Sequence, residues 1–334
     1  MTDETQFKQQ WVSYAETVNK VKHEIRRVIV GQERVIDELL ICLLTGGHAL
    51  FEGVPGLGKT LLVKTAAQCF DVPFSRIQFT PDLMPADIVG TNIITADDEG
   101  RNVFRFQPGP IFGSFVLADE INRATPKTQS ALLEAMQEQN VTVAGETRPL
   151  PRPFFVLATQ NPLESEGTYP LPEAQLDRFL LKIVVPFPTE AELRQIVTST
   201  TAGDRVQPSP VTDGAQLEQI QKMVQQVLVP DEVVSYAVRM LLLTHPSTEQ
   251  APEMVKQFVR AGAGPRGGQA LIQAAKARAF LDHRFNVAYE DIENVLYPCL
   301  RHRLLLNFEG EATGVQTEQL LDEVCAVAKG EQAP

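Results

Sequence analysis

The sequence contains few cysteines, and they form no recognisable motif. Cys42, Cys69, Cys299 and Cys325 are scattered through 334 residues, and no two of them have Cys-x-x-Cys spacing. This pattern argues against a zinc site and against a disulfide framework, and it is typical of reduced thiols. We therefore expect a cytoplasmic protein.

Long hydrophobic runs are also missing. No apolar stretch approaches the roughly 18 residues that a membrane-spanning helix requires. The first four residues are acidic in character, whereas a signal peptide begins with basic residues followed by apolar ones. We expect neither a membrane span nor a signal peptide.

Positive charge is in the minority. The sequence has 30 Lys and Arg against 42 Asp and Glu, which gives a formal net charge of −12. This balance disfavours a protein that wraps a nucleic-acid backbone, although a local basic loop could still bind one. Apolar residues make up 43% and charged residues 22%. These values are typical of a globular protein, and the length allows a core domain and a second, smaller one.

The stretch from Gly53 to Thr60 matches Gly-x-x-x-x-Gly-Lys-(Ser/Thr) at every fixed position. A strand-like segment precedes it and a helix-forming segment follows it, which is the context of a phosphate-binding loop and not of an ordinary glycine turn. Backbone N–H groups of such a loop surround phosphate oxygens at a helix N-terminus. Lys59 would contact the β- and γ-phosphates, and the Thr60 hydroxyl would bind Mg²⁺. The loop therefore predicts that the chain binds a nucleoside triphosphate, with candidate binding residues Gly53, Val54, Pro55, Gly56, Leu57, Gly58, Lys59, Thr60 and Leu61.

A second chemical candidate is the segment 115–120, in which four apolar residues precede Asp119 and Glu120. It predicts a buried parallel strand with carboxylates at its carboxyl edge, where open α/β sheets bind ligands. Asp119 would hold Mg²⁺ through its water shell, and Glu120 would orient and polarise the attacking water. Acids after an apolar run are mostly structural, but this pair follows the phosphate loop by roughly 60 residues, which favours the catalytic interpretation.

Three further features leave alternatives open when read from the residues alone. The turn Val30-Gly31-Gln32 could cover an adenine or simply join two helices. Asn161, at the end of an apolar strand, could contact the γ-phosphate or form an Asx turn before Pro162. Arg178 could neutralise charge on a nucleotide, but the residues alone favour a weak surface pair with Asp177.

Two β-hairpins are predicted within the nucleotide-binding part. Segments 88–94 and 103–106 would pair across a polar turn, inside a helix that opens near residue 80 and resumes after Gly109-Pro110. Segment 141–148 alternates around the turn Ala144-Gly145. For the first hairpin we favour a functional loop over a decorative insertion, because loops on a rigid scaffold tend to carry function.

The rest of the chain shows helical periodicity. Amphipathic patterns cover residues 5–29 and 33–45 before the loop, and about 189–201, 213–228, 231–245, 265–284, 288–300 and 316–328 after Pro186. Arg266 lies near a helix N-terminus, where a cation opposes the helix dipole, so it is expected to face an anion. Arg301-His302-Arg303 is interpreted as a solvated or partner-facing basic patch. The last helix is expected to pack on the lid or on a neighbour.

Taken in order, these motifs resemble those of an AAA+ ATPase, and more closely those of the MoxR family. The phrases that carry the resemblance include Val30-Gly31-Gln32, Thr80-Pro81-Asp82-Leu83-Met84-Pro85-Ala86-Asp87, Ala118-Asp119-Glu120-Ile121-Asn122-Arg123-Ala124, Ala158-Thr159-Gln160-Asn161-Pro162 and Leu171-Pro172-Glu173-Ala174-Gln175-Leu176-Asp177-Arg178-Phe179. The match covers about residues 5–310, and its motifs are highly specific.

The resemblance implies a fold and several residue roles. It implies an α/β AAA+ core over residues 1–186, a smaller all-α lid over 187–310 and a tail helix over 311–334. The core would be a five-stranded parallel sheet between helices, with two hairpin insertions. Asn161 becomes the sensor of the γ-phosphate, and Arg178 becomes an arginine finger acting on the ATP of a neighbouring subunit. Val30, Gly31, Gln32 and Arg266 join the nucleotide site, with Arg266 acting on its own subunit or on the next.

Such a finger requires head-to-tail contacts, which close into rings, so we expect an ATP-promoted hexamer. The resemblance implies a chaperone-like machine that remodels or matures partner proteins, including metal insertion, with a von Willebrand factor A domain protein as partner. A nucleic-acid motor is the alternative, but the acidic turn from Asp97 to Asn102 and the tip Ala144-Gly145-Glu146 disfavour it. A nucleotide-gated scaffold without turnover is disfavoured by Glu120 and Asn161.

Overall fold

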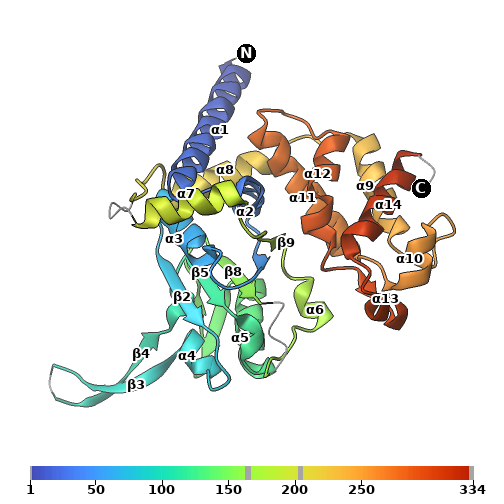
Figure 1. Cartoon of the computed structure of the whole chain (residues 1–334). Coiled ribbons are helices and arrows are strands. Elements are labelled where there is room, and N and C mark those ends of the chain that lie inside the picture. Colours follow the sequence, from blue (N-terminus) through green and yellow to red (C-terminus); the bar gives the residue numbers. More distant parts are fainter. Residues whose placement is uncertain (1, 99, 162–166, 202–205, 331–334) are drawn as a thin grey trace.

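A parallel sheet forms the centre of the protein, in a computed structural model that describes residues 2–98, 100–161, 167–201 and 206–330 (Figure 1). Its five strands run in the order β2-β5-β8-β1-β9. Their bounds are β2 (Phe74–Gln78), β5 (Phe115–Asp119), β8 (Phe155–Gln160), β1 (Ala49–Glu52) and β9 (Leu181–Val184). The predicted five-stranded parallel sheet is confirmed.

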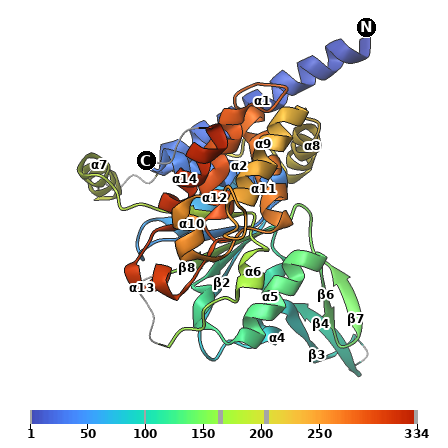
Figure 2. The ribbon, with the colours of Figure 1, turned by 90° about the vertical axis from the view of Figure 1, so that its right-hand side faces the viewer.

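Alternating side chains of the strands feed two separate apolar layers. Phe115 and Leu117 face one layer, to which α1 (Thr2–Val28), α2 (Glu33–Thr45) and α3 (Lys59–Cys69) contribute. Val116 and Ala118 face the other, with α4 (Pro85–Val89) and α5 (Pro126–Glu138). Strands buried on both faces are typical of a parallel sheet covered by helices, as Figure 2 shows for the α4 and α5 side.

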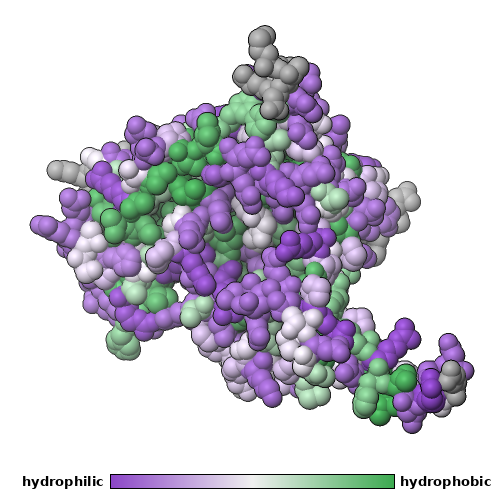
Figure 3. Space-filling model, turned by 180° about the vertical axis from the view of Figure 1, so that it is seen from behind, coloured by the Kyte–Doolittle hydropathy of each residue, from purple (hydrophilic) through white to green (hydrophobic). Residues whose placement is uncertain are grey.

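Both predicted hairpins are present. The first pairs β3 (Gly90–Ala96) with β4 (Asn102–Pro108), and the second pairs β6 (Asn140–Val143) with β7 (Glu146–Pro149). In the second hairpin, Ala144 and Gly145 both have positive φ, 52° and 84°, as a two-residue hairpin turn requires. Figure 3 shows the first hairpin projecting from the body, with hydrophobic residues near its tip.

The predicted helix does not resume after the first hairpin. Only a 3-10 turn, η1 (Pro110–Phe112), separates β4 from β5. The chain passes tightly here, because a Cβ on Gly109 would lie 2.2 Å from the Ile88 carbonyl oxygen at the end of α4. The two residues that follow η1 lead straight into the buried strand, so no room is left for another helical turn.

The C-terminal part is helical, with one short strand pair. Its helices are α7 (Glu190–Thr201), α8 (Gly214–Gln225), α9 (Asp231–Leu243), α10 (Glu253–Phe258), α11 (Pro265–Leu281), α12 (Tyr289–Leu300), α13 (Phe308–Thr313) and α14 (Thr317–Lys329). The short α10 and α13, and the antiparallel pair β10 (Val259–Ala261) and β11 (Leu305–Leu306), were not predicted. Of the two expected positions for the last helix, α14 takes the one on the lid, where it packs on α9 and α12.

The lid and one face of the sheet share a single hydrophobic core. Trp11 of α1 lies edge-on to Phe280 of α11, with ring centroids 4.9 Å apart. The same cluster continues from Phe115 in the sheet to Leu321 of α14, all of them buried. The predicted smaller helical lid is therefore present, and it packs onto the sheet layers through this shared core.

Across the described residues, no helix combines the length and the apolar character needed to cross a membrane.

Candidate functional site

The sheet topology brings three sequence-predicted segments to one edge. Because β8 lies between β1 and β5, the carboxyl end of β8 separates the phosphate loop from Asp119. The Gly53 N–H donates to the Gln160 carbonyl oxygen at 3.4 Å, so the loop starts beside the residue that precedes Asn161. Asn161 itself is buried. The loop, Asp119, Glu120 and Asn161 therefore lie at the edge where ligands of such sheets bind.

The phosphate loop has the backbone that its glycines allow. Gly56 and Gly58 have φ of 85° and 80°, and nothing lies near where their Cβ atoms would be. Lys59 is the first residue of α3, and its Nζ donates to the carbonyl oxygens of Gly53 at 2.5 Å and Val54 at 3.2 Å. Burial lowers the pKa of Lys59, while Asp119 and Glu120 act in the opposite direction, so its ammonium lies within the field of both carboxylates.

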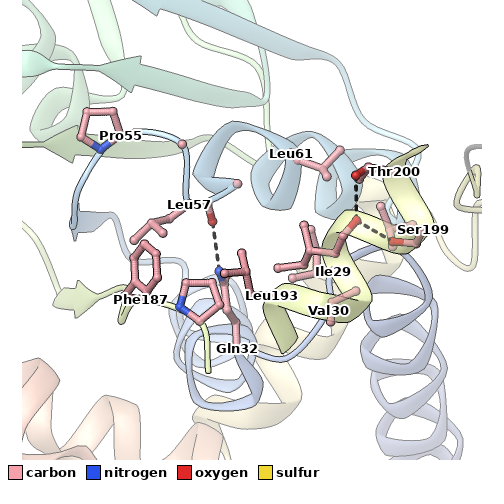
Figure 4. Close-up of a pocket in the computed structure, with 15 residues that line it drawn as sticks. Ile29, Val30, Gln32, Pro55, Leu57, Leu61, Phe187, Leu193, Ser199 and Thr200 are labelled. Carbon is pink, nitrogen blue, oxygen red and sulfur yellow. Dashed lines mark hydrogen bonds between the residues drawn. The ribbon is translucent and has the colours of Figure 1, made fainter. Parts of the chain in front are cut away.

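A cavity of about 230 Å³ adjoins the loop (Figure 4). Its walls come from the α1–α2 turn, the phosphate loop with α3, and the segment that contains α7. They are Val28, Ile29, Val30 and Gln32; Pro55, Gly56, Leu57, Gly58 and Leu61; and Phe187, Pro188, Leu193, Ile196, Ser199 and Thr200. This largely apolar cavity, continuous with a phosphate loop, has the character of a site for a planar base.

The Val30-Gly31-Gln32 turn is held against the phosphate loop. Gln32 has a left-handed backbone, with φ of 55°, and its Nε2 donates to the Leu57 carbonyl oxygen at 3.0 Å. Gly31 lies so close to α7 that a Cβ would fall 2.0 Å from the Glu192 Oε1 atom. Of the two interpretations left open by the residues, the geometry favours a wall of the cavity over a plain helix–helix turn.

The contribution of α7 was missed in the sequence. The helix has no fully buried residue, yet Leu193 and Ile196 line the cavity together with Phe187 from the preceding segment. Figure 4 shows Leu193 and Phe187 at this wall. The only sequence signal was the apolar spacing of 193, 196 and 197 in a helix otherwise rich in polar residues. That spacing is equally typical of a helix that packs on a protein core.

Both carboxylate oxygens of Asp119 have partners. Oδ2 accepts from Arg76 Nη2 at 2.7 Å and from Arg76 Nε at 3.1 Å, and Oδ1 accepts from the Thr159 hydroxyl at 2.5 Å. Arg76 and Thr159 were not singled out in the sequence. Their positions on β2 and β8, the two strands that flank β5, could have indicated them once the strand order was known.

Glu120 is held in a strained conformation next to Asp119. Its backbone is left-handed, with φ of 56°, and its N–H donates to the Thr159 hydroxyl at 2.9 Å. The carboxylate accepts from Gln78 Nε2 at 2.9 Å and from Arg123 Nη1 at 3.1 Å. Strained backbone that persists under several tethers is concentrated at functional sites.

The donor set fits a magnesium ion bound together with a nucleotide. Among the described residues, no group of three or more His, Cys, Asp or Glu side chains could hold a metal by itself. Mg²⁺ needs only one or two protein ligands when phosphate and water complete its shell. The Asp119 carboxylate and the Thr60 hydroxyl, on the second residue of α3, supply that number.

Arg178 and Arg266 lie together, but they do not line the cavity beside the phosphate loop. Both line another cavity, of about 270 Å³, between the carboxyl end of α5, the segment after α6 (Glu173–Leu176) and α11. Arg178 Nη1 donates to the Leu133 carbonyl oxygen at 2.8 Å, and Arg266 Nη1 lies 3.8 Å from Asp177 Oδ2. The sequence-predicted residues therefore form two groups on one chain.

The interpretation of Arg301-His302-Arg303 as a solvated or partner-facing patch is wrong. The three residues are 9%, 5% and 7% exposed. Arg301 pairs with Glu318 at 3.3 Å, and His302 and Arg303 bond to the core segment that contains Arg178. The sequence alone suggests an exposed basic cluster, because the acidic and carbonyl partners of these residues lie far away along the chain.

Comparisons with known proteins cover both parts of the chain. Residues 48–181 match the family model "ATPase family associated with various cellular activities (AAA)", and residues 252–324 match "AAA lid domain". The chain is 42% identical over 308 residues to Chaperone MoxR1 of Mycobacterium tuberculosis, covering 92% of this chain and 81% of that protein. It is 30% identical to Protein MoxR of Methylorubrum extorquens, covering 86% and 87%. A crystal structure of a candidate ATPase from Cytophaga hutchinsonii has a TM-score of 0.91 at 40% identity, covering 97% and 98%.

Proposed function

The chain belongs to the MoxR family of AAA+ ATPases, and from that premise we propose that it hydrolyses ATP at the interfaces of a ring of subunits. The observation that carries the proposal is the division of the predicted site residues into two groups. One group surrounds the phosphate loop, and the other, with Arg178 and Arg266, lines a separate cavity.

The first group binds and activates ATP within its own subunit. The adenine enters the cavity between the Val30–Gln32 turn and α7, and the loop amides and Lys59 hold the phosphates. Asp119 and Thr60 hold Mg²⁺, which neutralises charge on the phosphates when bound. Glu120 orients and polarises the attacking water, and Asn161 contacts the γ-phosphate. Thr159 supports this arrangement, because its one hydroxyl bonds to Asp119 and to the Glu120 backbone.

The second group acts on the ATP of a neighbour. Arg178 supplies positive charge to the γ-phosphate of the adjoining subunit, and Arg266 joins it from the lid. Two arginines that share a cavity away from their own phosphate loop support action in trans rather than in cis. Head-to-tail contacts of this kind close into a ring, and we propose a hexamer assembled in the presence of ATP.

The work of the ring is remodelling or maturation of partner proteins, with metal insertion as one form of it. The relative from Mycobacterium tuberculosis is called a chaperone. The β3–β4 hairpin supports a role of this kind, because Ile94 and Phe104 pair across its strands and are 64% and 77% exposed. A protein with a von Willebrand factor A domain is the proposed partner, and a nucleic-acid motor is the alternative.

The test mixes two inactive variants. Arg178→Ala leaves the phosphate loop intact but removes the finger, and Lys59→Ala does the reverse. Each alone should hydrolyse ATP on the order of 1,000-fold more slowly than the unchanged protein. Their mixture should recover activity, because a Lys59→Ala subunit supplies Arg178 to an intact site.

Absence of recovery at every mixing ratio would contradict action in trans. In the same assay, strong stimulation of the unchanged protein by single- or double-stranded DNA would favour the motor instead.

A further inference from the structure

Arg303 contacts the segment that carries the proposed finger more extensively than any other lid residue does among those described. This segment, residues 177–180, is called the finger turn below. Arg303 lies just after α12, and its side chain is 3% exposed. Its Nε donates to Asp177 Oδ1 at 2.7 Å, and its two other nitrogens donate to the carbonyl oxygens of Asp177, Phe179 and Leu180 at 3.2, 2.8 and 3.1 Å.

These bonds place Arg178 between fixed neighbours. The backbone carbonyls of Asp177 and Phe179 flank Arg178, and Arg303 Nη2 donates to both. His302 donates a further bond from Nε2 to the Phe179 carbonyl oxygen at 3.0 Å, and burial lowers the pKa of His302 so that its ring stays neutral. The Arg303 fork also donates to the Cys299 carbonyl oxygen at the end of α12, which ties the turn to the lid helix.

The chemistry of this contact is specific to a guanidinium. A buried cation is costly unless a carboxylate and further acceptors satisfy it, and Asp177 with four carbonyl oxygens does so here. The planar fork reaches several acceptors in fixed directions, whereas a lysine ammonium is a single point charge. No residue of the phosphate-loop cavity takes part in these contacts.

We propose that Arg303 is a positioning residue for catalysis in trans: it fixes the finger turn to the lid, so that Arg178 and Arg266 reach the neighbour's ATP as one rigid unit. This inference rests on the proposed function of Arg178. Arg266 Nη1 also lies 3.8 Å from Asp177 Oδ2, and Arg178 is the next residue after Asp177 in the chain. Both Arg178 and Arg266 are therefore positioned beside Asp177, whose carboxylate Arg303 binds.

The experiment uses Arg303→Lys in the full chain, with Arg301→Lys as the matched control. Arg301 is in the same loop and is similarly buried, but it bonds to the Tyr297 carbonyl oxygen and to Glu318 and not to the finger turn. In Arg303→Lys, a fluorescent ATP analogue should bind to each subunit with affinity within about twofold of normal. ATP hydrolysis should fall roughly 10- to 100-fold, because a displacement of about 1 Å in a reacting group has effects of that size. Arg301→Lys should retain at least half of the normal rate.

The decisive readout is recovery in mixtures. Arg303→Lys subunits mixed with Lys59→Ala subunits should regain hydrolysis, because the Lys59→Ala subunit brings a correctly held finger to an intact site. A general loss of folding would not be repaired in this way. Asp177→Asn keeps the shape of the turn and removes the ion pair. It should lose less ATP hydrolysis than Arg303→Lys does and should regain it in the same mixtures. This variant replaces Arg303→Lys in the experiment if Arg303→Lys does not fold.

Two results would overturn the inference separately from the proposed function. One is normal hydrolysis by Arg303→Lys. The other is that Lys59→Ala subunits restore ATP hydrolysis when they are mixed with Arg178→Ala subunits but not when they are mixed with Arg303→Lys subunits. If neither Arg178→Ala nor Arg303→Lys regains ATP hydrolysis in these mixtures, Arg178 does not act on the ATP of a neighbouring subunit. The proposed role of Arg303 is then overturned as well.

Discussion

At the scale of single residues, the main finding is that the proposed catalytic carboxylates are tethered from both neighbouring strands. Thr159 on β8 bonds to Asp119 and to the backbone of Glu120. Arg76 and Gln78 on β2 bond to Asp119 and Glu120 from the other side. The proposed magnesium ligand is thus paired with the Arg76 guanidinium, and a bound ion would have to displace or share that partner.

This pairing predicts the effect of Arg76→Ala on magnesium dependence. An ion pair of an exposed arginine such as Arg76 is worth about 0.2–1 kcal/mol, which corresponds to a factor of about 1.4 to 5. The Mg²⁺ concentration that gives half-maximal hydrolysis should fall by such a factor, because Asp119 no longer exchanges one cation for another. A magnesium titration of the ATPase rate measures this.

Lys222→Ala is the control, since it removes an exposed lysine on α8. A higher magnesium requirement in Arg76→Ala would show that Arg76 supports the ion site instead of competing for it.

At the scale of elements, the sequence correctly predicted those features that depend only on neighbouring residues in the chain. The phosphate loop needs its glycines within eight consecutive residues, and the strand before Asp119 and Glu120 is a continuous apolar run. Both hairpins follow from strand-like segments on either side of a short turn, which is polar in the first hairpin and is Ala144-Gly145 in the second. What it could not show depends on distant partners: Arg303 is buried because Asp177 lies beside it, 126 positions away. Likewise, the sequence of α7 has an ordinary amphipathic pattern, and only the structure shows that this helix lines the cavity.

His48 links two elements and makes stability depend on pH. Its Nδ1 accepts from the Val156 N–H of β8 at 2.9 Å, and its Nε2 donates to the Met136 carbonyl oxygen of α5 at 3.2 Å. Burial lowers the pKa of this imidazole from 6.5 to about 4. Below pH 6.5 the unfolded chain takes up a proton that the folded chain excludes, so this stability is complete above pH 6.5 and is lost as the pH falls toward 4.

Urea unfolding at pH 7 and pH 5 tests this. His48 should account for roughly 2 kcal/mol of the decrease in the free energy of unfolding between the two. His48→Gln should be less stable at pH 7 but should show a smaller decrease, whereas the exposed His283→Gln should keep the full decrease. If the free energy of unfolding of His48→Gln fell between pH 7 and pH 5 as much as that of the unchanged protein, His48 would not be the source of the pH dependence.

The β3–β4 hairpin should be separable from the ATPase. Ile94 and Phe104 are largely exposed, so changing both to Ser should cost less than about 0.5 kcal/mol of stability each. Hydrolysis without client should stay within about twofold of normal. Suppression of aggregation of a heat-denatured reporter enzyme, measured by light scattering with ATP, should be lost if the tip binds exposed apolar segments.

Leu228→Ser is the matched control, because Leu228 is 70% exposed and lies outside the hairpin. Full suppression by the Ile94→Ser/Phe104→Ser protein would place the client surface elsewhere.

At the scale of the whole molecule, ATP binding and assembly should be separable from turnover. Glu120→Gln keeps the shape and the hydrogen bonds of the side chain but cannot polarise water as a carboxylate does. It should bind ATP normally, lose at least about 100-fold in rate, and accumulate as a species of six chains in light scattering after gel filtration with ATP and Mg²⁺. Glu134→Gln, an exposed position on α5, should behave as the unchanged protein. Retained hydrolysis in Glu120→Gln would remove Glu120 from its role.

The core that the lid shares with the sheet bears on how a ring of these subunits could do mechanical work. Trp11, Phe115, Phe280 and Leu321 belong to one buried cluster, so bending a subunit between its two parts would open apolar surface to water. In the proposed ring, the joints that yield at low cost would then be the contacts between copies. Each subunit would behave as a stiff lever, and the stroke would be a change in the angle between neighbouring levers.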